Sequence, residues 1–153
     1  MKRISKSGNK IHFTSLGCAR NLVDSEVMLG ILLKAGYEPA EHLEDADFLI
    51  VNTCGFLAES RKESCDTIDV LLKERKKDAK VIVAGCMVQK YGPEIRSRFP
   101  SVHYFLGSGD MEKILEAVQT PESGTAITSA RSYLEWGEVP RQISTPKNYA
   151  YLK

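Results

Sequence analysis

The chain has almost no net charge, because 21 Lys and Arg residues stand against 20 Asp and Glu residues among its 153, which leaves a formal net charge of +1. Domains that bind nucleic acid usually carry a basic excess or a basic stripe, so this balance argues against a direct nucleic-acid site. No continuous apolar run approaches the ~18 residues of a membrane span, and no apolar core follows the basic start "MKRISKSGNK". We therefore expect no membrane partner and a cytoplasmic protein.

Cysteine is also scarce, and the four that occur are far apart in the sequence, with no C-x-x-C pair among them. In a reducing cytoplasm such residues are free thiols or metal ligands rather than disulfides. Structural zinc normally takes four ligands in close pairs, so the spacing argues against zinc. A chain of this length buries roughly 70% of its unfolded surface and needs no covalent cross-link to fold.

Apolar runs alternate with amphipathic stretches from residue 11 to about residue 119, which is typical of βαβ units. We predict an α/β fold: an open, mostly parallel sheet of four to five strands with helices on both faces, a flavodoxin-like three-layer sandwich. Asn21 and Asp110 are the expected N-caps of the first and last helices, and "YGPE" should break the third helix before Pro93. Residues 1–10 are expected to be poorly ordered, and residues 120–153 to be a linker with at most a short edge strand. The predicted strands cover residues 11–15, 48–51, 81–84 and 102–106.

Three of these strands are followed by a cysteine with a glycine directly beside it, in "SLGCARN", "VNTCGF" and "VAGCMV". Successive cysteines lie about one βαβ unit apart. Parallel strands joined by right-handed crossovers end on the same edge of a sheet, so Cys18, Cys54 and Cys86 should face one crevice. Glycine lets the backbone approach closely at such a place.

Each of these cysteines taken alone is most simply a small apolar residue that packs in the core. Three at matching strand ends favour a ligand-binding site instead. Clusters of thiolates select iron–sulfur centres, and three ligands on a four-iron cube leave one iron open. His12 and His103 lie within or at the start of strands, at the wrong edge, so we interpret them as ordinary side chains and exclude a Cys–His nucleophile. Cys65 lies on the apolar face of a helix and is predicted to be core.

Four segments resemble the N-terminal domain of the radical methylthiotransferases: "SLGCARNLVDSE", "VNTCGFLAESRKES", "AGCMVQKYGPEI" and "LGSGDMEKI". They are most similar to the branch that modifies a small-subunit ribosomal protein. The resemblance covers roughly residues 11–118, and we predict one iron–sulfur domain over residues 11–119. It implies a four-iron four-sulfur cluster held by Cys18, Cys54 and Cys86. It implies that the open iron holds the sulfur of a methylthio group, which is added to the β-carbon of an aspartate in that ribosomal protein.

The resemblance also implies partners that this chain lacks. In the family, S-adenosylmethionine and a second four-iron cluster belong to a central radical barrel, and a small C-terminal domain helps to hold the substrate. No cysteine loop for that second cluster occurs in the 153 residues, so we expect the chain alone to be inactive, with residues 120–153 leading toward the barrel. Residues expected beside the first cluster are Gly17, Asn21, Asn52, Gly55 and Gly85, the two asparagines as hydrogen-bonding groups.

Three other functions stay open on the sequence. The branch of the family that modifies transfer RNA is similar at the three cysteines. A flavodoxin-like module that binds a nucleotide or flavin has the same expected fold, although "LGCARN" is a poor phosphate loop. A redox or iron-storage scaffold would use the same thiols without methylthiolation.

Overall fold

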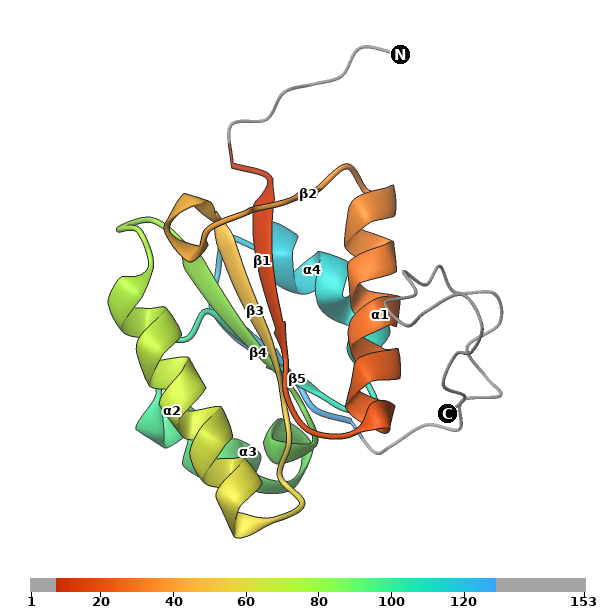
Figure 1. The fold of residues 1–153 in the computed structure, drawn as a ribbon, viewed down its shortest axis with the longest axis vertical. Coiled ribbons are helices and arrows are strands. Elements are labelled where there is room, and N and C mark those ends of the chain that lie inside the picture. Colours follow the sequence, from red (N-terminus) through yellow and green to blue (C-terminus); the bar gives the residue numbers. More distant parts are fainter. Residues whose placement is uncertain (1–7, 129–153) are drawn as a thin grey trace.

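A six-stranded, all-parallel sheet forms the centre of the computed structural model, which describes residues 8–128 (Figure 1). The strand order is β2-β1-β3-β4-β5-β6. The prediction of four to five strands was too low, because two strands of two and three residues flank the longer ones. These edge strands form by pairing with β1 and β5 and have no apolar run of their own. The strands are β1 (Lys10–Ser15), β2 (Glu38–Pro39), β3 (Phe48–Thr53), β4 (Lys80–Gly85), β5 (Tyr104–Gly107) and β6 (Gly124–Ala126).

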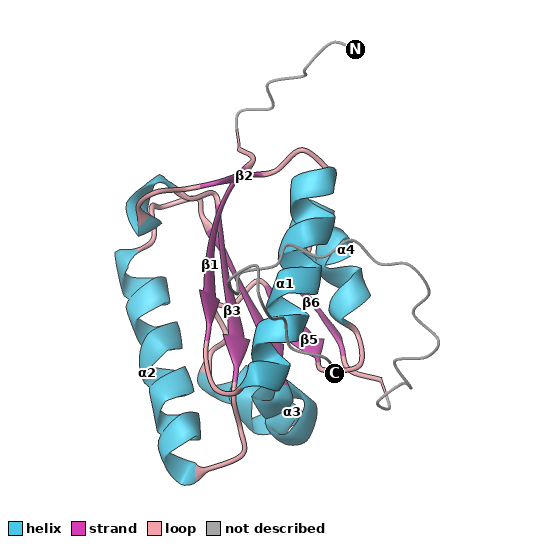
Figure 2. Cartoon of the chain, turned by 45° about the vertical axis from the view of Figure 1, so that its right-hand side comes forward, coloured by secondary structure: helices cyan, strands magenta, loops and turns pink. Residues whose placement is uncertain are grey.

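Four helices cover both faces of the sheet, which confirms the three-layer sandwich (Figures 1 and 2). Helices α2 (Ala58–Glu74) and α3 (Cys86–Arg98) lie on one face, and α1 (Ala19–Lys34) and α4 (Ile114–Gln119) lie on the other. Two short 3-10 turns, η1 (Leu43–Asp45) and η2 (Met111–Lys113), complete the described elements. Residues 1–7 and 129–153, where a poorly ordered start and most of the linker were predicted, lie outside the described residues.

The central strands β3 and β4 are buried and mostly apolar because both of their faces are covered. Residues that alternate along β3 and β4 point to opposite layers: Leu49 and Val51 pack under α2 and α3, whereas Ile50 packs under α1 and α4. Cys65, on α2, belongs to the first of these apolar clusters and is only 6% exposed, as predicted for a core residue. No helix within residues 8–128 is long and apolar enough to cross a membrane.

Neither of the two predicted cap residues, Asn21 and Asp110, makes a side-chain capping bond, and the physical reason is the same for both. Helix α1 begins at Ala19 with Cys18 in the N-cap position, three residues before the predicted cap, and Asn21 is buried inside the helix. Asp110 does precede η2, but its side chain makes no capping bond. In both cases the polar side chain binds groups brought close by the tertiary fold instead of its own helix. The break in α3 is confirmed, since Tyr91 has non-helical angles two residues before Pro93.

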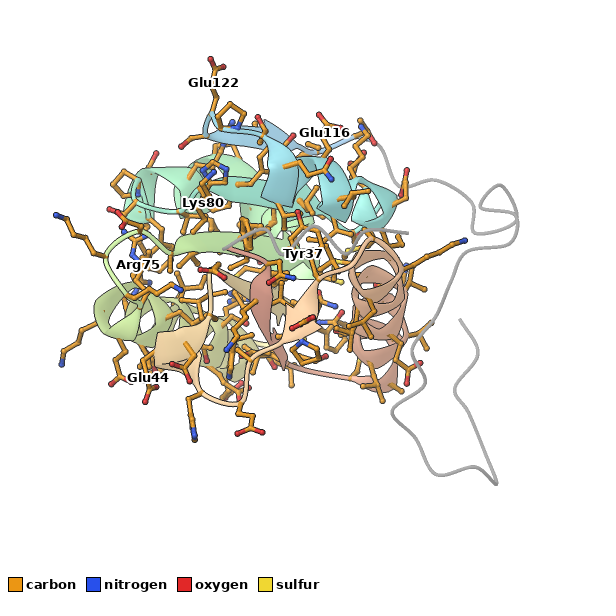
Figure 3. All side chains as sticks on the ribbon, turned by 90° about the horizontal axis from the view of Figure 1, so that it is seen from above. Tyr37, Glu44, Arg75, Lys80, Glu116 and Glu122 are labelled. Carbon is orange, nitrogen blue, oxygen red and sulfur yellow. The ribbon has the colours of Figure 1, made fainter. Side chains whose placement is uncertain are left out.

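The amino end of the sheet is closed by turns and charged side chains (Figure 3). Lys80 begins β4 and donates to the carbonyl of Thr120 at 3.3 Å, and Arg75 donates to the carbonyl of Ala79 at 3.0 Å. Tyr37 packs edge-on against Phe48 with ring centroids 5.8 Å apart, and burial raises the pKa of this phenol. The opposite, carboxyl end carries the cysteines.

Candidate metal centre at the carboxyl edge

Cys18, Cys54 and Cys86 each follow one of three adjacent strands, β1, β3 and β4. The strand ends are level, because Ser15 pairs with Asn52 and Thr53 pairs with Gly85. All three cysteines therefore lie at the carboxyl edge, the lower end of the sheet in Figure 1. Cys18 is exposed, Cys86 is partly buried, Cys54 is buried, and none of the three forms a disulfide.

The loop before Cys18 lies directly against Cys54. A Cβ atom on Gly17 would stand 2.5 Å from the Cβ and 2.9 Å from the Sγ of Cys54, so only glycine permits this approach. Gly17 also has a φ of 89°, in the left-handed region that glycine adopts without strain. The first and second cysteine loops are thus in contact.

The second and third cysteine loops interlock in a similar way. Gly85 has φ 110° and ψ −166°, a combination open essentially to glycine alone, and a Cβ there would overlap the carbonyl oxygen of Thr53. A Cβ on Gly55 would lie 2.9 Å from the Cα of Met87, the residue after Cys86. The glycine beside each cysteine therefore allows close approach of backbone to backbone or side chain.

Asn21 contacts all three cysteine-bearing segments from helix α1. Its Nδ2 donates to the carbonyls of Leu16 at 2.9 Å and Thr53 at 2.8 Å, which precede Cys18 and Cys54. Because both bonds use the amide nitrogen, the orientation of the amide is fixed, and Oδ1 faces the Sγ of Cys86 at 3.7 Å. One buried side chain thereby ties the three strand ends together.

Asn52, the last but one residue of β3, holds the backbone of Asn21 in place by a hydrogen bond. It is fully buried, and its Nδ2 donates to the carbonyl of Asn21 at 2.9 Å and to Oγ of Ser25 at 3.0 Å. Ser25 in turn bonds Oγ of Ser15 at 2.7 Å. The Oδ1 of Asn52 has no hydrogen-bond partner among the described residues and lies 2.5 Å from where a Cβ of Gly85 would be. A buried, unpaired acceptor beside the third cysteine loop marks a polar site.

Helix α2 holds the backbone of Cys54 through Ser64, a residue that was not predicted from the sequence. The hydroxyl of Ser64 accepts from the N–H of Cys54 at 3.2 Å and donates to its carbonyl at 3.1 Å. Arg61 donates to the carbonyl of Gly55 at 3.5 Å, and its guanidinium lies 5.3 Å from the ring centre of Tyr91. Ser64 could have been noticed, because it is a polar residue one turn before Ile68 on the buried face of α2.

The remaining candidates of the sequence lie elsewhere. Cys65 packs in the core, and His12 and His103 lie toward the amino ends of β1 and β5. The Nε2 of His103 is 3.0 Å from the carbonyl of Thr120, and burial lowers the pKa of this imidazole. None of these three residues joins the group at the carboxyl edge.

Within residues 8–128, no three His, Cys, Asp or Glu side chains converge closely enough to hold a single metal ion. These residues therefore form no site for a single metal ion, in which all ligands bind the same atom. A four-iron cube takes each thiolate on a different iron, so its ligands surround a larger volume. Three thiols from three adjacent loops are the type of ligand that such a cluster takes.

Known proteins resemble the chain over nearly its whole length. It is 66% identical over 146 residues to the ribosomal protein uS12 methylthiotransferase RimO of Protochlamydia amoebophila, an alignment that covers 95% of this chain and 31% of that protein. The proteins of the same name from Chlamydia abortus and Bdellovibrio bacteriovorus are 62% and 40% identical, with 96% and 100% of this chain covered and 32% and 35% of theirs. The chain thus spans about a third of the length of these relatives.

A family comparison covers the part of the chain that forms the cysteine edge. Residues 10–107, which include β1 to β5 and all three candidate ligands, match the family described as "Uncharacterized protein family UPF0004". The match extends over almost two thirds of the chain, from the first residue of β1 to the last residue of β5. On this evidence the chain is a member of the UPF0004 family.

Proposed function

We propose that this chain is the N-terminal domain of a methylthiotransferase that acts on ribosomal protein uS12, and that Cys18, Cys54 and Cys86 hold a four-iron four-sulfur cluster in it. The observation that carries the proposal is the arrangement of three cysteines, none in a disulfide, at the ends of three adjacent parallel strands joined by the side chain of Asn21. The names of the relatives, with 40–66% identity, support the activity and the substrate.

The residues around the thiols suit such a group. Gly17, Gly55 and Gly85 leave no side chains between the three loops, so the loops approach one another closely. Asn21 fixes the carbonyls of Leu16 and Thr53 by hydrogen bonds, and Asn52 in turn holds the backbone of Asn21, which orients the ligands before any metal arrives. When bound, a cluster with three protein thiolates supplies one iron that is free to hold the sulfur to be transferred.

In the proposed enzyme, this domain and the other domains of the longer protein have separate tasks in the reaction. This chain would hold the sulfur, while a radical barrel with its own cluster and S-adenosylmethionine, and a C-terminal substrate-holding domain, would belong to the longer protein. The target would be the β-carbon of an aspartate in the ribosomal protein, and the protein would work in the cytoplasm. The chain itself contributes orientation and exclusion of water, through the buried Cys54 and the network of Asn21 and Asn52.

Anaerobic reconstitution with iron and sulfide tests the proposal. We expect about four iron and four sulfide per chain, and expect Cys18→Ala, Cys54→Ala and Cys86→Ala each to abolish binding. Cys65→Ala is the matched control, because this thiol is buried in the core: it should keep its iron and lose about 1 kcal/mol of stability. Circular dichroism establishes that each variant is folded. Equal loss of iron in all four folded variants, or full retention in all four, contradicts the assignment.

A further inference from the structure

The described chain leaves the sheet at the same edge as the cysteines. Strand β6 runs parallel to β5, so the residues after it, Ile127 and Thr128, emerge at the carboxyl edge. A strand of three residues at the edge of a sheet has few backbone bonds of its own and opens easily. Contacts beyond the strand must therefore hold this exit in place.

Asp110 provides the first of these contacts, from the turn after β5. Its carboxylate accepts from the backbone N–H of Thr128 at 2.8 Å and from the Thr128 hydroxyl at 3.0 Å, and Lys113 lies 3.0 Å away. The Asp110 side chain is fully buried. Burial would raise the pKa of Asp110, but the bonds from Thr128 and Lys113 outweigh it and lower the pKa, so the carboxylate is charged at neutral pH.

Gln89 provides the second contact, from helix α3. Its Nε2 donates to the carbonyl of Thr128 at 2.9 Å, so Thr128 is bound at its N–H, its hydroxyl and its C=O. A Cβ on Gly107 would overlap the carboxamide of Gln89, so this side chain lies against the end of β5. A Cβ on Gly92 would stand 2.8 Å from the Cδ1 of Ile127, so α3 meets the exit segment at a second point.

We propose that Asp110, Gln89 and Thr128 form an exit clamp, a set of positioning residues that fixes the first turn of α3 relative to the chain leaving the sheet. Gln89 is three residues after Cys86, which begins α3, so the clamp holds the helix end that carries the third thiol. This gives a role to the segment "LGSGD", which has no part in the cluster assignment itself. The exit clamp is present without iron, and only its effect on a bound iron–sulfur cluster rests on the proposed function.

Amide hydrogen exchange on the iron-free 153-residue chain tests the clamp. Gln89→Met keeps the length of the side chain and removes its donor, and Thr128→Val keeps the branched shape and removes the hydroxyl. We expect both variants to exchange the amides of residues 90 and 91, which close the first turn of α3, about fivefold faster, as for the loss of one hydrogen bond. Thr67→Val is the matched control, because the Thr67 hydroxyl donates only to the carbonyl of Glu63 within α2. It should leave exchange in α3 unchanged.

Unchanged exchange at residues 90 and 91 in both clamp variants overturns the inference, and so does equal acceleration throughout the chain, which would report a global loss of stability. In iron-loaded protein, the same two variants should release iron to a chelator several-fold faster than Thr67→Val. If the chain does not take up iron at all, the proposed function fails, while the exchange result on iron-free protein still decides for or against the clamp.

Discussion

Asn21 should contribute more to stability than any exposed asparagine of the chain, although it lies inside a helix. Asn21→Ala removes two donated hydrogen bonds, to the carbonyls of Leu16 and Thr53, and leaves these carbonyls without that donor. The net value of a hydrogen bond is about 1 kcal/mol, and a buried group left unpaired costs about 1–3 kcal/mol. The bond to Thr53 is buried, whereas that to Leu16 is partly exposed to water. We therefore expect a total loss of about 2–4 kcal/mol.

Urea unfolding followed by circular dichroism measures this loss. Asn9→Ala is the matched control, since the Nδ2 of Asn9 donates to a single carbonyl, that of Gly36, in an exposed position. It should cost no more than about 1 kcal/mol. If the two variants lose equal stability with unchanged m-values, Asn21 does not hold the cysteine loops together, and the reasoning is refuted.

Asn21→Asp gives a sharper form of the same test, because it keeps the shape of the side chain and reverses its polarity. The introduced carboxylate would face two carbonyl oxygens in a buried place, which raises its folded-state pKa above the unfolded value of about 3.9. A raised acid pKa means that the folded state binds the proton more tightly, so stability falls as the pH rises. The variant should thus approach wild-type stability near pH 4 and lose it progressively toward pH 7. A pH-independent difference would contradict the fixed orientation of the amide.

Three further outcomes follow from the geometry. Gly85→Ala should cost about 3 kcal/mol or more of unfolding free energy, because it adds a clash with the Thr53 backbone to the strain of a glycine-only conformation. Gly36→Ala is the control: Gly36 has φ 93° but open space around it, and the substitution should cost about 1–2 kcal/mol. Equal losses of stability in urea unfolding would refute the clash. The lowered pKa of Asp110 gives stability that is present above the unfolded pKa of about 3.9 and is lost as the pH falls through the folded value. Asp110→Asn should therefore reduce the loss of stability on acidification, measured by urea unfolding at a series of acid pH values. An unchanged pH dependence would count against the clamp. The chain alone, reduced and anaerobic, should release no 5′-deoxyadenosine from S-adenosylmethionine above a no-enzyme control, because it lacks a second cysteine loop, and detection of the product would overturn this.

Local pattern was sufficient to predict the layered architecture. Strands β3, β4 and β5 contribute apolar residues to both faces of the sheet, and the helices between the strands have one apolar face, so the spacing of apolar residues along the sequence predicts the layers. Right-handed crossovers then leave one arrangement in which Cys18, Cys54 and Cys86 share an edge. The prediction was incomplete at one edge, because β2 exists only through pairing with β1 and has no pattern of its own, whereas β6 lies where at most a short edge strand was expected.

Polar contacts, by contrast, were decided by the tertiary structure. Asn21 has the residue type of a helix cap, but its partner Thr53 lies 32 residues away, and Asp110 binds Thr128, 18 residues away, instead of capping η2. Hydrogen-bond partners depend on which loops the packed sheet brings together, and no local period encodes that choice. The sequence by itself thus determined the sheet, its direction and the edge on which three thiols lie. The tertiary structure alone decided that Asn21 and Ser64 bind the cysteine loops and that Gln89 binds Thr128, because buried polar groups must take whatever partners the packing places within reach.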